Sequence, residues 1–69
     1  MMVTVNRVAG YRKMLNLTQA DIAKKLGISA QAYGQKENGK VAFKDQEKII
    51  MVNILKIANP DLNIQNLFF

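Results

Sequence analysis

The chain has 69 residues, a formal net charge of +5 and neither cysteine nor histidine. This length is enough for one domain, so residues 1–69 are predicted to form a single domain. The missing residue types exclude disulfides and thiolate or imidazole metal sites, and no metal or cofactor is expected. With few acids and no glycine loop to cradle phosphate, the sequence also gives no support for an enzyme.

No apolar run has the length of a signal peptide or a membrane span. The longest apolar stretch, from Ile49 to Leu55, is interrupted by Asn53. It falls far short of the ~20 residues that a membrane span requires. We therefore expect a soluble cytoplasmic protein that does not bind a membrane.

The basic residues are concentrated in residues 7–44. That range holds eight bases against two acids: Arg7, Arg12, Lys13, Lys24, Lys25, Lys36, Lys40 and Lys44 against Asp21 and Glu37. Residues 45–69 hold two bases and three acids. A basic excess of this kind is typical of a surface that faces phosphate, although a solvated lysine-rich surface has the same composition.

A first helix is predicted from about Val5 to Leu15. Val5, Val8 and Leu15 fall on one side of it at helical spacing. Thr4 is its candidate N-cap, and Asn16 suits the position after the helix because asparagine tolerates left-handed dihedrals.

A second helix begins at Thr18. The residues T-Q-A-D form a capping box in which Asp21 can reach back to the Thr18 backbone. Gly27 can take the left-handed conformation that ends the helix. Ala23 is small, so a neighbouring helix is expected to cross close to it.

A third helix is capped by Ser29 and is predicted from about Ala30 to Glu37 or Asn38. It follows the second helix across a short turn that contains Gly27. Two short helices joined in this way have the outline of a helix-turn-helix, whose second helix can enter the major groove of DNA.

If Tyr33 faces the core, an uncharged, amide-rich stripe of the third helix faces away from it. The stripe consists of Gln31, Gly34, Gln35 and Asn38, with Ala30 beside them. Glutamine can pair with the N6/N7 edge of adenine, and alanine can contact a thymine methyl. A solvated polar face would look the same on an isolated helix, but the position after the glycine turn favours DNA reading.

A long fourth helix is predicted from about Asp45 to Ala58, and Asn59-Pro60 ends it. Its predicted core face comprises Ile50, Met51, Ile54, Ile57 and Ala58. Three further apolar residues, Ile49, Val52 and Leu55, exceed what one face needs and are covered by another element or mark an interface. A short fifth helix follows the candidate cap Asn63, and its apolar side comprises Ile64, Leu67 and Phe68. An all-α domain of five helices results.

The segment LTQADIAKKLGIS…Y…ENGK, from Leu17 to Lys40, resembles the lambda-repressor-like helix-turn-helix family of phage repressors, Cro proteins and bacterial regulators. Residues 6–12 look like the first helix of that family and residues 62–68 like its last. The resemblance implies a compact five-helix domain that binds double-stranded DNA as a sequence-specific transcriptional regulator. It also implies a homodimer on a two-fold operator, formed either in solution or only on DNA. No small-molecule effector is expected, and the chain looks more like a phage Cro protein or a small repressor than a sensor-linked regulator.

The resemblance also implies roles for individual residues. The base-reading residues would be Ser29, Ala30, Gln31 and Gln35. The residues that contact phosphates would be Thr18, Gln19, Asn38, Lys40 and Lys44, and Gln19 would also brace the recognition helix. Arg12 and Glu37 match positions that form an internal ion pair in some members of the family.

Three residues depart from the pattern of the family. Tyr33 replaces an aliphatic core residue, and Gly34 removes a side chain from the reading face, either for close approach to DNA or as a neutral change. Lys36 stands where an apolar residue is common, and its ammonium is expected to reach out from a stem that covers the core.

An alternative function is an antitoxin-type protein-interaction module, in which the surplus apolar residues bind a partner protein. Those residues would be Ile49, Val52, Leu55 and Phe69.

Overall fold

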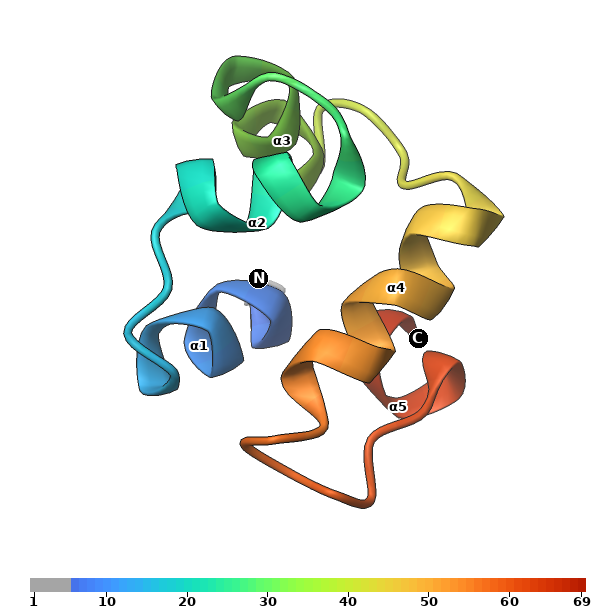
Figure 1. Ribbon diagram of the computed structural model, residues 1–69. Helices are drawn as coiled ribbons and strands as arrows, with labels where there is room; N and C mark the ends of the chain where they lie inside the picture. The colour runs from blue at the N-terminus through green and yellow to red at the C-terminus, as the bar shows by residue number, and fades with distance from the viewer. Residues whose placement is uncertain (1–5) are drawn as a thin grey trace, which may run out of the picture.

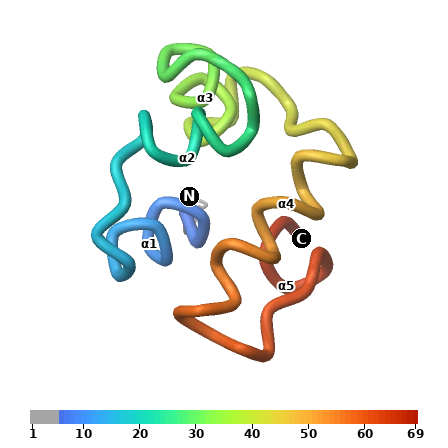
Figure 2. Tube along the Cα trace, in the orientation of Figure 1, coloured from blue at the N-terminus to red at the C-terminus, as the bar shows by residue number. Residues whose placement is uncertain are grey.

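Five helices and their connecting turns make up residues 6–69, the part of the chain that the computed structural model describes. They are α1 (Arg7–Met14), α2 (Gln19–Leu26), α3 (Ala30–Glu37), α4 (Asp45–Leu55) and α5 (Ile64–Phe68). In Figure 1, α2 and α3 lie together at the top of the molecule, and α4 lies beside α5 at the lower right. α1 lies below α2 and contacts α4 and α5, and the Cα trace in Figure 2 shows the connection from α3 to α4 running down one side. The predicted all-α fold of five helices is therefore confirmed.

The ends of the second and third helices lie where local sequence signals predicted them. The Thr18 hydroxyl accepts a hydrogen bond from the Asp21 backbone N–H, and the Asp21 carboxylate accepts one from the Thr18 N–H. Gly27 closes α2 in the left-handed conformation, with φ 73°. The Ser29 hydroxyl oxygen accepts a hydrogen bond from the Ala32 N–H at the start of α3. Each of these signals acts within four residues, which is why the sequence alone was sufficient.

α1 begins later than predicted. It starts at Arg7, and the Asn6 side chain caps it by accepting a hydrogen bond from the Ala9 N–H. Thr4 and Val5, the predicted cap and first residue, lie outside the described residues. Asn16 has the left-handed φ of 58° that the sequence predicted after this helix.

The core joins all five helices. Its fully buried side chains are Ile22, Tyr33, Met51 and Leu55. Val8 and Ala23 and the C-terminal Val52, Leu62 and Leu67 complete it. Rings of Tyr33, Phe43 and Phe68 extend this core edge to face, with centroid separations of 6.1 and 5.3 Å.

The core-facing side of α4 differs from the predicted one. The buried residues are Glu47, Met51, Val52 and Leu55. Ile50 is 36% exposed and Ile57 is 79% exposed, so two residues of the predicted core face are at the surface. Val52 and Leu55, predicted as surplus, belong to the core. The helix also ends at Leu55 rather than Ala58, so Ile57 lies in the turn that follows it.

The physical reason is that α4 carries apolar residues on almost every side, so helical spacing does not select one face. The packing of α4 against α1 and α5 makes that selection. Within residues 6–69 no helix is both long and apolar enough to cross a membrane, and no cluster of three potential metal-ligating side chains occurs.

Candidate nucleic-acid interface

α2 and α3 form the packed helix pair that the sequence predicted. Ile22 and Ala23 of α2 and Tyr33 of α3 are buried, and the exposed fraction of Ala23 is only 2%. The turn between the helices is closed by a hydrogen bond of 3.0 Å from the Ile28 N–H to the Ala23 carbonyl. α3 is therefore held against α2 along one side, and its other side is left to solvent.

The predicted base-reading residues all lie on the solvent side of α3. Ser29, Ala30, Gln31 and Gln35 are exposed. Within residues 6–69 the side chains of Gln31 and Gln35 form no hydrogen bond, so their amides retain both donor and acceptor atoms for a ligand. The Ser29 oxygen already caps α3, which leaves its O–H free to donate.

Glu37, on the opposite side of α3, is a buried carboxylate that joins three helices. Arg12 of α1 binds it with two hydrogen bonds, from Nε to Oε2 at 2.8 Å and from Nη2 to Oε1 at 3.0 Å. The Tyr33 hydroxyl donates to Oε2 at 2.6 Å, and Gln19 Nε2 of α2 donates to Oε1 at 3.2 Å. The ion pair implied by the resemblance is thus present, as one part of a larger network.

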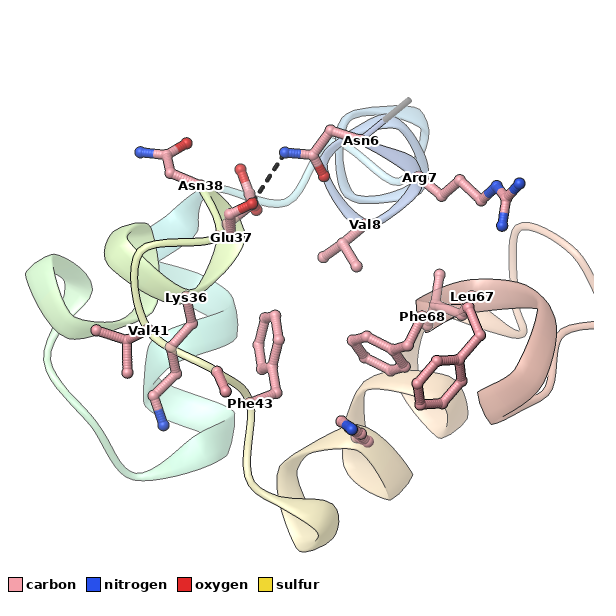
Figure 3. Close-up of a pocket in the computed structure, with 14 residues that line it drawn as sticks. Asn6, Arg7, Val8, Lys36, Glu37, Asn38, Val41, Phe43, Leu67 and Phe68 are labelled. Atoms are coloured by element: carbon pink, nitrogen blue, oxygen red, sulfur yellow. Dashed lines mark hydrogen bonds between the residues drawn. The ribbon is translucent and has the colours of Figure 1, made fainter. Parts of the chain in front are cut away.

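The ends of α1 and α3 are joined by a second contact. The side chain of Asn6, the N-cap of α1, donates to the Glu37 backbone carbonyl at 3.0 Å (Figure 3). Arg12 also donates from Nη1 to the Leu17 carbonyl at 2.9 Å, which fixes the chain just before α2. Among the described residues no buried side-chain nitrogen or oxygen lacks a hydrogen-bond partner.

These hydrogen bonds set the ionisation of the network. Burial opposes the charged form of Glu37, but hydrogen bonds from Arg12, Tyr33 and Gln19 outweigh burial and hold the pKa of Glu37 below its usual value. The hydrogen bond to Glu37 raises the pKa of Arg12. Burial, followed by the Glu37 carboxylate, raises the pKa of the Tyr33 hydroxyl. At neutral pH the network therefore contains an anion, a cation and a neutral phenol.

Gln19 of α2 is predicted to contact phosphate and to brace α3. Its side chain lies against α3 at the border between the buried face, which carries Glu37, and the exposed face. It is half-buried, and besides its hydrogen bond to Glu37 its side chain lies beside Gly34. A β-carbon at position 34 would lie 3.3 Å from Gln19 Oε1. The bracing contact is therefore present in the structure, and the phosphate contact stays a prediction.

The other predicted phosphate contacts are exposed and lie near the ends of α2, α3 and α4. Thr18 caps α2, Asn38 follows α3, and Lys40 and Lys44 lie in the connection to α4. Backbone hydrogen bonds fix this connection at both ends, from the Lys40 N–H to the Gln35 carbonyl and from the Lys44 N–H to the Glu47 carboxylate. The two lysines are therefore carried on a segment tied to both neighbouring helices.

Lys36 contradicts the prediction made for it. Its ammonium does not reach out to solvent but donates to the Glu47 carboxylate, and both side chains are only 9% exposed. The buried acid on the inward face of α4 supplies a partner that the sequence did not reveal. Burial opposes the ionisation of Glu47, but the hydrogen bonds from Lys36 and the Lys44 backbone outweigh it and lower the pKa of Glu47.

The basic surface is therefore smaller than the sequence suggested. Arg12 and Lys36 are both neutralised by buried acids, and Arg7 donates to the Asn66 carbonyl. Lys40 and Lys44 are the exposed bases that follow α3. Both ammonium groups are accessible to solvent, and the phosphate contact expected of them stays a prediction.

A cavity of about 490 Å³ opens beside the end of α3, between the start of α1, the connection to α4 and the end of α5 (Figure 3). Val8, Phe43 and Phe68 form part of its apolar wall, and Asn38 also lines it. Neither Gln31 nor Gln35 is among the described residues that line it, so the cavity is separate from the amide-rich face of α3.

A family model described as helix-turn-helix matches residues 8–58, which include α1 from its second residue, α2, α3, α4 and the turn between α2 and α3. No curated protein and no solved structure gave a significant match. The family model covers most of the chain and agrees with both the motif residues and the five-helix fold. The chain therefore belongs to the lambda-repressor-like helix-turn-helix family of DNA-binding regulators.

Proposed function

We propose that this protein is a sequence-specific transcriptional regulator that inserts α3 into the major groove of DNA. The observation that carries the proposal is the division of α3 into two faces. The inward face holds Tyr33 and Glu37 in a saturated hydrogen-bond network. The outward face presents Gln31 and Gln35, whose amides suit base edges. With this division, one face holds the helix in place while the other can present polar side chains to base edges in the groove.

The proposal includes binding of a two-fold operator as a homodimer. Half-sites of such an operator are about 34 Å apart, one turn of the DNA helix. The principal extents of the molecule are 30, 28 and 23 Å. Two copies on successive turns would therefore come close to contact without a large interface, so we propose a weak dimer that forms mainly on DNA.

We further propose that the protein represses transcription, in the manner of the phage Cro proteins and small repressors that it resembles. At an operator that overlaps a promoter, the bound domain would exclude the polymerase sterically. A reporter gene whose promoter contains a DNA sequence that the protein binds would test this part of the proposal. A repressor would lower its expression, and an activator would raise it.

An antitoxin-type interaction module has weaker support. It depended on four surplus apolar residues, and Val52 and Leu55 are part of the core. Ile49 and Phe69 remain exposed, at 51% and 73%. Of the four residues on which this alternative depended, only these two are therefore available to a partner protein.

Fluorescence anisotropy with labelled duplex DNA across a salt series tests the main proposal. Each neutralised phosphate contributes about −0.9 to the slope of log K against log salt, so a dimer that uses Lys40 and Lys44 should give a slope of roughly −4. Selection from a random duplex pool should then yield a palindromic sequence. Absence of binding at about 50 mM salt, where non-specific contacts are strong, would refute the proposal.

A further inference from the structure

Gly34 leaves a space on α3 that is occupied by a side chain from another helix. A β-carbon at position 34 would lie 3.3 Å from Gln19 Oε1 and 3.8 Å from its Cδ and Nε2. A contact of 3.3 Å is tighter than nine in ten real β-carbon contacts, so the Gln19 carboxamide would have to move by a few tenths of an ångström. At Gly10, also within a helix, a β-carbon would meet nothing within 4 Å. The space beside Gly34 is therefore filled specifically by the carboxamide of Gln19.

The Gln19 carboxamide is held from two sides. Its Nε2 donates to Glu37 Oε1 at 3.2 Å, and the rest of the group lies beside Gly34, one helical turn earlier in α3. Its Oε1 and its second N–H form no hydrogen bond within residues 6–69. Glu37 itself is fixed by Arg12 and Tyr33, so the anchor for Gln19 is rigid.

Glycine is a poor choice at this position for the helix itself, because it is less favourable than alanine in a helix interior. Gly34 lies within the amide-rich stripe with Gln31 and Gln35, where alanine would retain the helix without adding a polar group. The contact with Gln19 supplies a physical reason for the absence of a side chain.

We infer that Gly34 is a positioning residue for DNA recognition and acts through Gln19. The missing β-carbon allows the Gln19 carboxamide to lie against α3 and to add its unbonded carbonyl and N–H to the face formed by Gln31 and Gln35. The surface that meets DNA is then composed of side chains from two helices. This inference rests on the proposed function, because it assigns the contact that Gln19 makes with DNA.

A double-mutant cycle on the full chain tests the inference. Gly34→Ala should weaken binding to the selected operator about tenfold when Gln19 is present, which is the loss expected for one good polar contact. In a Gln19→Ala background the same change should alter affinity less than about twofold, since nothing remains to displace. Gly10→Ala is the matched control and should leave operator affinity unchanged, because its methyl group meets open space.

A structural readout separates positioning from general stability. In Gly34→Ala the side-chain amide resonances of Gln19 should shift in an ¹⁵N NMR spectrum of the free protein, whereas in Gly10→Ala they should not. Gln19→Met fills a similar space without an amide and should weaken binding as much as Gln19→Ala.

Equal weakening by Gly34→Ala with and without Gln19 would overturn the inference while leaving the proposed function intact, because Gly34 would then act by its own approach to DNA. Unchanged or tighter binding by Gly34→Ala would overturn it as well. If the unaltered protein bound no duplex DNA, the proposed function would fail and the inference with it, even if the Gln19 resonances shifted.

Discussion

Glu37 is the residue on which the position of α3 depends. It is buried, and its carboxylate accepts four hydrogen bonds, two from Arg12 and one each from Gln19 and Tyr33. Four is about the number of lone-pair sites that a carboxylate offers. These donors offset the desolvation cost of the buried charge. Loss of one donor should therefore lower the stability of the fold by more than the energy of a single hydrogen bond, because the charge stays buried.

Removal of Arg12 should be strongly destabilising. Arg12→Ala leaves the Glu37 charge buried without its cation and should lower the free energy of unfolding by about 3–5 kcal/mol. Urea unfolding followed by circular dichroism would measure the change. Lys13→Ala removes an equal charge from the exposed neighbouring position and should stay within about 0.5 kcal/mol. Similar losses for the two variants would mean that the buried pair is not the cause.

Loss of the Tyr33 hydroxyl should have a smaller effect. Tyr33→Phe keeps the ring in the core but removes one donor to Glu37, and should cost about 1–3 kcal/mol because the hydrogen bond reaches a charged group. Thermal unfolding would measure this loss of stability, with Tyr11→Phe as the control. The Tyr11 hydroxyl accepts from the neutral Asn59 amide, so its loss should cost less.

Substitutions of exposed side chains on α3 and just after it should fall into two classes, those that change sequence preference and those that change overall affinity for DNA. Gln31→Ala should change the preferred operator sequence, because it removes a candidate base contact. Lys40→Ala should weaken all duplexes alike and reduce the salt slope by about 1 per subunit. Lys56→Ala, with the same change of charge at the far end of α4, should do neither. Uniform weakening by both Gln31→Ala and Lys40→Ala would mean that the reading face is wrongly assigned.

At the scale of elements, the sequence was most informative where the determinants were local. The caps at Thr18 and Ser29 and the turn at Gly27 follow from residues four or fewer positions apart, and they lie as predicted. The buried face of α4 could not be predicted, because that helix is apolar on several sides and its neighbours decide which side faces inward.

The candidate site was predictable to a different extent at each residue. Helical periodicity alone indicated that Gln31 and Gln35 face solvent once Tyr33 is placed in the core. The contact between Arg12 and Glu37 spans 25 positions, so no local pattern reveals it, and only the family resemblance implied it. The inward turn of Lys36 could not be predicted, because its partner, Glu47, lies 11 positions further along the chain on another helix and no local pattern pairs the two.

The turn between α2 and α3 should be intolerant of a side chain. Gly27→Ala forces alanine into a left-handed conformation and should lower stability by about 1–2 kcal/mol. Gly10→Ala, in the interior of α1 with open space around it, should raise stability by roughly 0.5–1 kcal/mol. Parallel urea titrations of the two variants would measure both, and a loss at Gly10 would contradict the reasoning.

At the scale of the whole molecule, the two buried acids join its halves and make stability depend on pH. Glu37 links α1, α2 and α3, and Glu47 links the end of α3 to α4. Both have a pKa below that of a free glutamate. Their contribution to stability is therefore complete above the unfolded pKa of about 4.3 and is lost as the pH falls through the lower folded values.

The free energy of unfolding should accordingly be nearly constant from pH 7 to about pH 5 and fall steeply at lower pH. Glu37→Gln should be less stable at pH 7 but should lose less on acidification, because one of the protonating groups is gone. Urea titrations at a series of pH values would reveal the two slopes. Equal slopes for the variant and the unaltered protein would show that Glu37 does not take up the proton.

The two-faced construction of α3 has a consequence for how this protein can change over time. Tyr33 and Glu37 fix the helix from within, whereas Gln31 and Gln35 take no part in that support. A library randomised at positions 31 and 35 should therefore remain folded while its members acquire new operators. Under the proposed function, substitutions at these two positions would therefore change the binding preference without requiring compensating stability mutations.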